Sequence, residues 1–442
     1  MSIIILCFIF IIYNLNDDYN NNNNNNKIPL TIINKTIALS RGAVCLDGSP
    51  PGFYFRPSLS KHNNNKKWVV FFKGGGWCED VKGCFERSKT ELGSSTKFPL
   101  YFGLGGPIDP NESNNPTFFS YNHVILWYCD GASFSGNNNN KEIFVNNKTG
   151  TTSKLYFRGF RILNVLFDIL LKPPYNLNMA TDVLLTGGSA GGLAAYLHAD
   201  YIKNKKLPFV SNFRVAPISG FFPLHDNADG QPFFGSYMKK VFNLHQSKDG
   251  VNQKCIRSFN DSNNDETWKC MFANYTLGFT SSDIPFFPIQ SIYDSVQLAF
   301  ILNSTELNKF GCLLRIYPQF AECTEKQITL LNIFAKDVLH DIQVQFLNKS
   351  YNSKNNNDGG FIENCYEHVQ GQGSLGFNGY RLNNITMNVA LSKWWYGDNN
   401  NNNNNNDNNS GTRNNPFFHW PIFLNLTAPI QPSLSCNVAP PD

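Results

Sequence analysis

The sequence predicts an α/β fold in which helices cover both faces of a mostly parallel sheet. Short runs rich in β-branched and aromatic residues alternate with longer segments whose apolar residues recur at helical spacing. Several short runs are apolar at every position, as in strands that are buried on both faces. The chain has 442 residues, 41% of them hydrophobic, and is therefore long enough to bury one large core.

Strand and helix patterns alternate along most of the chain. Six segments carry the strand pattern, at 68–72, 123–128, 182–185, 213–218, 285–293 and 361–362. Helical spacing marks four segments, at 155–171, from 193 onward, at 325–347 and at 387–395. This order predicts a single domain, with an irregular insertion at about 225–280.

Asparagine tracts mark the surface loops and the domain boundaries. They lie at 20–26, 63–65, 137–140, 355–357 and 399–406. Asparagine favours turns over strands and helices, so each tract is expected to be a solvated loop. The predicted division is a signal peptide at 1–20, a folded domain at 38–396, an asparagine-rich loop at 397–415 and a tail at 416–442.

The first residues and the cysteines predict secretion. Residues 3–13 are almost wholly apolar, which fits a signal peptide and is too short a stretch for stable membrane insertion. Without Cys7, which lies in this stretch, an even number of cysteines remains, as disulfides in an oxidising compartment require. No paired Cys-x-x-Cys spacing predicts a metal site. The one local disulfide that we predict joins Cys78 to Cys84.

The charge of the chain excludes one class of partner. The net charge is only +4, and no basic run with interleaved aromatic residues occurs. Nucleic-acid binding surfaces need such a basic footprint, so no nucleic-acid partner is expected. We expect a monomer.

The most informative motif follows the strand at 182–185. Residues 187–191 read Gly-Gly-Ser-Ala-Gly, and a helix-compatible run begins at Leu193. A strand, a tight turn that carries serine and a helix make the nucleophile elbow of α/β-hydrolase-like proteins, where the serine hydroxyl stands above the sheet. The alternative is a plain glycine-rich turn, but the flanking strand and helix favour Ser189 as a nucleophile.

Chain order and spacing select partners for this serine. A serine hydroxyl needs a base, and the base needs an acid that orients it. In this fold the acid precedes the histidine, and both follow strands. Asp294 ends the run at 285–293, and His368 follows the strand at 361–362. The alternatives precede a strand, lie within a predicted helix or follow the last helix: Asp283, Asp337, Asp341, His340 and His419.

Two segments of the sequence can supply backbone amides to an oxyanion. Ala190 follows the serine and offers one amide. The glycines directly after the strand at 68–72 offer the second site, because a backbone without side chains lets a ligand oxygen approach closely. The second site is thus predicted within the segment Gly74-Gly75-Gly76-Trp77, and the alternative for this segment is a simple hairpin turn.

Seven ordered segments across residues 38–396 resemble the pectin acetylesterase family, which includes the Notum carboxylesterases. They are GAVCLDGSPPGFYF at 42–55, GGGWC at 74–78, YCDGASFSG at 128–136, LYFRGFRI at 155–162, GGSAGGLA at 187–194, IYDSVQL at 292–298 and CYEHVQ at 365–370. The resemblance implies a secreted serine esterase with an α/β-hydrolase core and no cofactor or metal. It also implies catalytic roles for Ser189, Asp294 and His368, with the oxyanion at Gly75, Gly76 and Ala190.

The chain resembles the plant-type acetylesterases more closely than Notum, and it departs from the family pattern at several positions. Gly76 stands where Notum-like proteins carry a tryptophan beside their lipid pocket, and Lys73 replaces the usual acidic residue. Gly188 and Val369 stand where many plant members have cysteine.

The resulting hypothesis is removal of O-acetyl groups from an extracellular polysaccharide. The alternatives are a Notum-like deacylase of a lipidated protein, and a secreted glycan-binding protein without catalysis. Phe221, Phe222, Phe286 and Phe287 are candidate walls for a longer acyl pocket, although core packing is the favoured interpretation of these residues.

Overall fold

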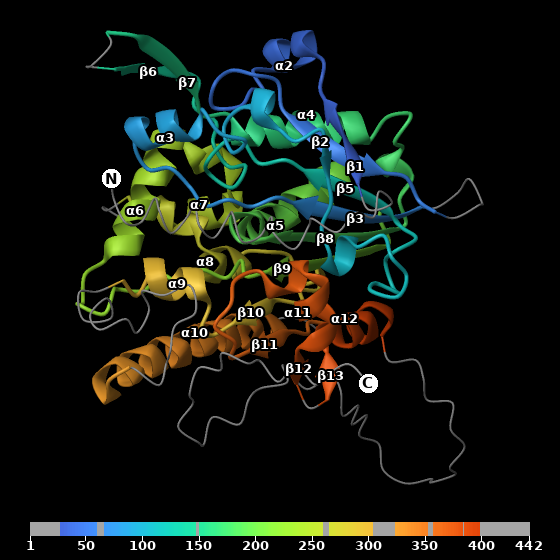
Figure 1. Cartoon of the computed structure of the whole chain (residues 1–442), viewed down its shortest axis with the longest axis vertical. Helices are drawn as coiled ribbons and strands as arrows, with labels where there is room; N and C mark the ends of the chain where they lie inside the picture. Colours follow the sequence, from blue (N-terminus) through green and yellow to red (C-terminus); the bar gives the residue numbers. More distant parts are fainter. Residues whose placement is uncertain are drawn as a thin grey trace.

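The computed structural model describes residues 27–59, 66–146, 150–259, 265–303, 323–351, 357–382 and 384–397 (Figure 1). The predicted signal peptide at 1–20 and the tail at 416–442 lie outside the described residues, as does nearly all of the loop at 397–415. Among the described residues, no helix combines the length and the hydropathy needed to cross a bilayer.

A nine-stranded sheet forms the centre of the described structure. Its order is β11 (Phe361–Glu363), β10 (Ile289–Ser291), β9 (Asn212–Ile218), β8 (Asp182–Gly188), β3 (Lys67–Phe72), β5 (Asn122–Leu126), β2 (Gly52–Arg56), β1 (Ile28–Ile32) and β4 (Tyr101–Phe102). The first six strands run parallel, whereas β2, β1 and β4 each run antiparallel to their neighbour. The prediction of a mostly parallel sheet is confirmed.

The central strands are buried on both faces. Every residue of β5 is buried, and so is every residue of β3 and β8 after the first. Consecutive side chains of a strand point to opposite faces, so this pattern requires cover on both sides. Helix α5 (Ala190–Tyr201) packs on β8, β9 and β3, and α12 (Met387–Tyr396) contacts β11. The continuous apolar runs of the sequence thus mark the middle of the sheet.

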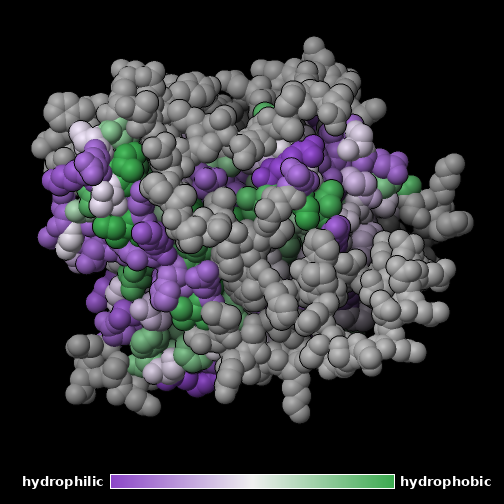
Figure 2. All heavy atoms as spheres, turned by 90° about the horizontal axis from the view of Figure 1, so that it is seen from below, coloured by the Kyte–Doolittle hydropathy of each residue, from purple (hydrophilic) through white to green (hydrophobic). Residues whose placement is uncertain are grey.

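The remaining helices surround this sheet (Figure 1). They are α2 (Lys35–Arg41), α3 (Val81–Arg87), α4 (Gly159–Leu170), α6 (Phe233–His245), α7 (Gln253–Phe259), α8 (Ala273–Leu277), α9 (Ser295–Phe300), α10 (Glu325–Tyr351) and α11 (Ser374–Gly379). Two small hairpins join β6 (Lys141–Val145) to β7 (Thr152–Tyr156) and β12 (Arg381–Leu382) to β13 (Ile385–Thr386). On the face shown in Figure 2, hydrophilic and hydrophobic side chains of the described residues are interspersed.

Two expectations from the sequence are wrong. The segment at 155–171 is not one helix, because Leu155 and Tyr156 pair with Glu142 and Lys141 in the β6–β7 hairpin and α4 begins only at Gly159. The insertion at about 225–280 is largely helical, since it contains α6, α7 and α8. The expected helices at 325–347 and 387–395 are confirmed as α10 and α12.

Three disulfides join described cysteines. The predicted Cys78–Cys84 bond is confirmed. The other two are Cys45–Cys129 and Cys255–Cys270, which connect residues 84 and 15 positions apart. Such bonds persist in oxidising compartments.

Candidate active site

Ser189 lies at the sharp turn between β8 and α5. Its backbone angles are φ 58° and ψ −128°, a conformation that is strained for any residue with a side chain. The turn is held from both sides, because the Ser189 amide donates to Ile218 O at 2.9 Å and its carbonyl accepts from Leu193 N at 2.9 Å. Strain of this kind marks functional sites, and here it leaves a serine half-buried at the end of a parallel strand.

Asp294 and His368 form a buried pair at the same edge of the sheet. Asp294 follows β10 and caps α9, with Oδ1 accepting from Val296 N at 3.0 Å and Gln297 N at 3.1 Å. His368 follows β11, and its Nδ1 lies 2.9 Å from Oδ1 and 2.7 Å from Oδ2 of Asp294. An ionised carboxylate only accepts, so Nδ1 carries the proton and donates it.

The other nitrogen of His368 is therefore the basic one. Nε2 is buried and has no hydrogen-bond partner among the described residues. Ser189, Asp294 and His368 follow β8, β10 and β11, which are parallel, so all three lie at the carboxyl edge of the sheet. The arrangement brings a serine hydroxyl, an imidazole oriented by a carboxylate and that buried carboxylate to the same edge of the sheet.

Ser219 connects the loop of His368 to the serine turn, and sequence reasoning missed it. Its hydroxyl accepts from Val369 N at 2.9 Å and donates to Gln370 Oε1 at 3.1 Å. The preceding residue, Ile218, is the one whose carbonyl accepts from Ser189 N. The signal was a Ser-Gly pair at the end of the strand at 213–218, the usual place for functional groups in such sheets.

A buried carboxyl supports the same loop. Gln370 Nε2 donates to Glu363, which also accepts from the Cys365 amide. Burial raises the pKa of Glu363 well above its usual value. This chain of contacts continues from β11 through Gln370 to Ser219.

The glycine loop after β3 lies directly against the serine turn. A Cβ on Gly74 would lie 2.1 Å from Gly188 O and 3.1 Å from Ser189 Cβ, so no larger residue fits there. Gly75 and Gly76 have φ values of 152° and 66°, which favour glycine. Ala190 begins α5, and the first amides of a helix have no partner within the helix. The three residues named for the oxyanion hole thus belong to two adjoining segments.

Aromatic side chains pack beside the histidine. The ring centroids of Phe222 and His368 are 6.4 Å apart, and those of Phe222 and Trp77 are 4.9 Å apart in an edge-to-face arrangement. Phe234 packs against both Trp77 and Phe222. Trp77, Phe222 and Phe234 are all buried. They form a closely packed apolar wall, which we call the aromatic wall.

The alternative carboxylates and histidines of the sequence lie elsewhere. Asp337 and His340 are on the exposed side of α10, and Asp337 pairs with His225 at 3.0 Å. Asp283 is exposed and bonds Ser281, while Asp341 lies on α10. His419 lies outside the described residues.

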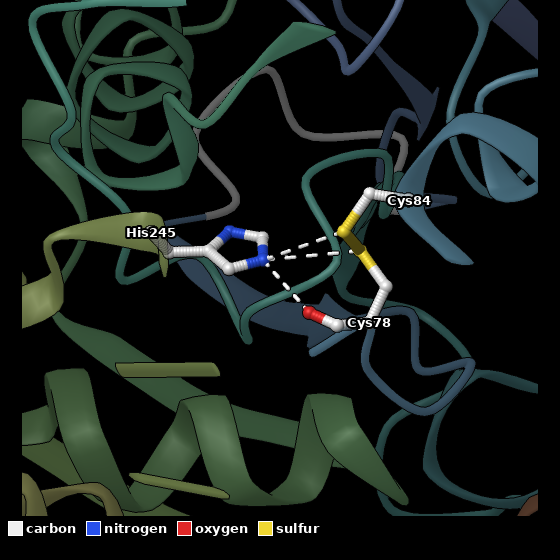
Figure 3. Close-up of side chains that lie close together, drawn as sticks. All are labelled: Cys78, Cys84 and His245. Carbon is white, nitrogen blue, oxygen red and sulfur yellow. Dashed lines mark hydrogen bonds between the residues drawn. A yellow bond between two sulfur atoms is a disulfide. The ribbon is translucent and has the colours of Figure 1, made fainter. Parts of the chain in front are cut away.

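Cys78, Cys84 and His245 form a further cluster (Figure 3). Their ligand atoms lie within 4.8 Å of one another, but the two sulfur atoms are bonded to each other. His245 Nε2 lies 3.0 Å from Cys78 O, and burial lowers the pKa of its imidazole to about 3. The thiolates that a metal would need are absent, so these residues make a disulfide packed on a neutral histidine.

Comparison with known proteins decides the family. Residues 21–412 match the model of the pectinacetylesterase family. The chain belongs to this family. It is accordingly a carboxylic ester hydrolase.

Plant relatives match more of this pectinacetylesterase chain than Notum proteins do. Pectin acetylesterase 5 of Arabidopsis thaliana is 32% identical, over 81% of this chain and 78% of the relative. Pectin acetylesterase 11 of the same plant is 30% identical, over 83% and 87%. The palmitoleoyl-protein carboxylesterase NOTUM of Schmidtea mediterranea is 36% identical, but only over 36% of this chain and 28% of its own. The predicted resemblance to the plant-type members is confirmed.

A solved structure shares the fold. The Wnt deacylase Notum from Drosophila superposes with a TM-score of 0.64 at 22% identity, covering 84% of this chain and 93% of its own. The α/β-hydrolase-like architecture predicted from the alternating strand and helix patterns is thereby confirmed.

Proposed function

We propose that this protein is a secreted serine esterase that removes O-acetyl groups from an extracellular polysaccharide. The observation that carries the proposal is the buried His368–Asp294 pair at the sheet edge where Ser189 lies. Within the described part of the chain, His368 Nε2 has no hydrogen-bond partner. The three disulfides between described cysteines are consistent with secretion.

The chemistry follows the two-step serine mechanism. His368 Nε2 takes the Ser189 proton as Oγ attacks the ester carbonyl, and Asp294 stabilises the imidazolium that forms. The protonated His368 then gives this proton to the departing alcohol, which leaves an acyl-enzyme on Ser189. Water activated by His368 releases the acid and restores the serine.

The oxyanion of each tetrahedral intermediate lies against the amides of Gly75, Gly76 and Ala190 in this proposal. Preorganised amide donors stabilise charge that develops in the transition state, and loss of one donor typically lowers kcat by about 10² to 10³. The contact of Gly74 with the serine turn supports the assignment, because it keeps the glycine loop beside Ser189.

The aromatic wall favours a short acyl group. Phe222, Trp77 and Phe234 are buried against one another beside His368, so a long acyl chain entering along them would have to displace packed rings. Gly76 also carries no side chain with which to line a lipid pocket. An acetyl group needs no such displacement.

The first experiment compares p-nitrophenyl acetate with p-nitrophenyl octanoate, using Ser189→Ala as the blank, and then measures acetate released from acetylated pectin and acetylated xylan. Preference for acetate, lost in the variant, supports the proposal. Preference for octanoate favours a Notum-like deacylase instead. A protein that neither turns over any ester nor reacts with a fluorophosphonate probe would be the glycan-binding alternative.

A further inference from the structure

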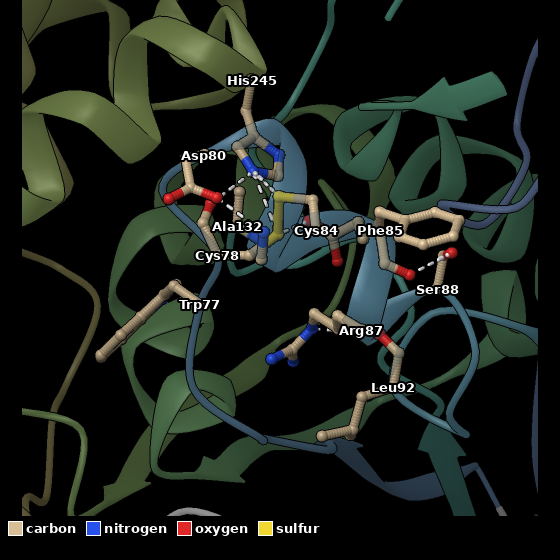
Figure 4. The surroundings of a disulfide bond; sticks show 12 residues. Trp77, Cys78, Asp80, Cys84, Phe85, Arg87, Ser88, Leu92, Ala132 and His245 are labelled. Carbon is tan, nitrogen blue, oxygen red and sulfur yellow. Dashed lines mark hydrogen bonds between the residues drawn. A yellow bond between two sulfur atoms is a disulfide. The ribbon is translucent and has the colours of Figure 1, made fainter. Parts of the chain in front are cut away.

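Arg87 contacts the glycine loop from the side of α3, of which it is the last residue (Figure 4). Its Nη2 donates to Gly75 O at 2.7 Å and lies 3.4 Å from Gly76 O. Its Nε donates to Leu92 O at 3.2 Å, so the guanidinium plane is fixed from two directions. A rigid planar fork of this kind orients the carbonyls that it binds.

The orientation of a carbonyl determines that of the next amide. In a trans peptide, C=O and the following N–H point in opposite directions. The bond from Arg87 to Gly75 O therefore turns the Gly76 N–H away from Arg87. A Cβ on Gly75 would meet Leu92 and Arg87, whereas one on Gly74 would meet the serine turn. The loop thus lies between Arg87 and the turn that carries Ser189.

A second network fixes the next peptide and the start of α5. Tyr128 Oη donates to Gly76 O at 2.7 Å and accepts from Ser133 N at 3.0 Å. Ser133 Oγ donates to Ala190 O at 2.8 Å and accepts from Trp77 Nε1 at 2.8 Å. The guanidinium of Arg87 also lies 5.2 Å from the centre of the Tyr128 ring. These contacts join the glycine loop to the residue that follows Ser189.

The Cys78–Cys84 disulfide keeps α3 in register with the loop. Cys84 lies in the turn of α3 before Arg87, and Cys78 ends the glycine loop. The disulfide closes the backbone from Cys78 to Cys84, and Arg87 lies three residues beyond this closed segment (Figure 4). From there its guanidinium donates to Gly75 O. The disulfide thus fixes the backbone that leads to Arg87, and the bond to Gly75 O fixes its guanidinium.

We propose that Arg87 is a positioning residue that aims the Gly76 amide at the oxyanion. The inference rests on the proposed function, since it assumes that this amide binds the oxyanion. A misdirected amide weakens binding of the transition state while leaving the ground-state ester nearly untouched, so the effect falls on kcat and spares KM.

The test compares Arg87→Met and Arg87→Lys with the wild-type enzyme on p-nitrophenyl acetate. We expect kcat to fall by about 10² in the methionine variant and less in the lysine variant, with KM within about threefold. The affinity for a trifluoromethyl ketone, which forms a tetrahedral adduct, should fall in step with kcat/KM. Added guanidinium at low concentration should restore part of the kcat of Arg87→Ala.

A matched control and the opposing results separate this inference from the proposed function. Arg41 makes an ion pair with Asp168 on the surface, so Arg41→Met should leave kcat unchanged. Full kcat in Arg87→Met would overturn the role of Arg87. So would a rise in KM as large as the loss of ketone affinity, with no rescue by guanidinium. Wild-type activity in Ser189→Ala would instead overturn the proposed function.

Discussion

The hydroxyl of Ser219 accepts a hydrogen bond from the backbone amide of Val369 at 2.9 Å. Val369 has φ 58°, an unfavourable angle for a β-branched residue, and it immediately follows His368. Ser219 thereby holds a strained peptide next to the proposed base. The contact joins the end of β9 to the loop after β11, across β10.

Removal of this hydroxyl should slow the reaction. In Ser219→Ala, the buried Val369 amide loses its acceptor, and an unsatisfied buried amide costs about 1–3 kcal/mol. We expect kcat to fall about tenfold as the His368 loop relaxes, because small misplacements of a reacting group are costly. Steady-state kinetics of Ser219→Ala and the exposed control Ser211→Ala measure this. Equal kcat in both variants would contradict it.

Asp294→Asn should leave the fold intact and remove most activity. The asparagine amide still caps α9 through its oxygen, but it no longer selects the Nδ1–H tautomer of His368. We expect kcat to fall by about 10³ to 10⁴, with an unchanged melting temperature to within a few degrees. A loss below tenfold would exclude Asp294 as the orienting acid.

Gly74→Ala tests the contact between the glycine loop and the serine turn. The new methyl would lie 2.1 Å from a backbone oxygen, so the loop has to move away from Ser189. We expect at least a ~100-fold loss of kcat, since displacement by about 1 Å is enough for that. Gly373→Ala is the matched control, because a Cβ there has no atom within 4 Å. Similar kinetics for the two variants would refute the contact.

The Cys78–Cys84 disulfide should matter for turnover as well as for stability. Replacing both cysteines by serine should lower kcat about tenfold, because α3 and the glycine loop lose their covalent link. The Cys255–Cys270 bond connects α7 to the segment before α8, and its removal should cost about 3 kcal/mol of stability while kcat is retained. Chemical denaturation and kinetics of both double variants provide the comparison. A retained kcat in Cys78→Ser/Cys84→Ser would be the contrary result.

Buried neutral histidines predict loss of stability in acid. Burial lowers the pKa values of His123, His198 and His245 to about 3, 4 and 3, respectively. At pH values between these pKa values and the unfolded pKa near 6.5, the unfolded chain binds more protons than the folded chain does. The free energy of unfolding therefore falls as pH falls. Each histidine contributes about 1.4 kcal/mol per pH unit in that window. Asp130 opposes this, because burial raises its pKa to about 7.

His245→Gln isolates one of these contributions. Glutamine keeps a donor for Cys78 O but does not titrate. The free energy of unfolding should therefore change less steeply from pH 4 to 6, by about 1.4 kcal/mol per pH unit, which corresponds to one bound proton. The control is His340→Gln, on the exposed side of α10. Urea denaturation at several pH values measures both slopes, and parallel slopes for His245→Gln and the wild-type protein would contradict the prediction.

Sequence patterns predicted those elements whose own residues carry a distinctive composition. The elbow at 187–191 carries its own glycines, and the parallel strands are apolar throughout. Strand β1 contains Pro29 and pairs only at the antiparallel edge, where neither alternation nor burial is strong. The sequence analysis also missed the β6–β7 hairpin, in which residues 152–156 form a strand by pairing with residues 141–145.

The supporting residues of the site were beyond the reach of spacing arguments. Ser219 and Val369 are 150 positions apart, and Arg87 acts on carbonyls of residues 11 and 12 positions earlier in the chain. A serine in a strand end or an arginine at a helix end is common in any sequence. Only the folded chain distinguishes these residues from their neighbours.

Positive φ angles at Ser189, Ser219 and Val369 should delay the return of activity when the protein refolds. Non-glycine residues in such conformations cost about 1–3 kcal/mol each and persist only when their surroundings enforce them. The contacts that stabilise these three turns come from β8, β9, β10 and β11 together. The turns are therefore not stabilised until all four strands have paired. After dilution from denaturant, esterase activity should therefore recover later than the circular dichroism signal of the secondary structure. Enzyme activity would then report the last step of folding.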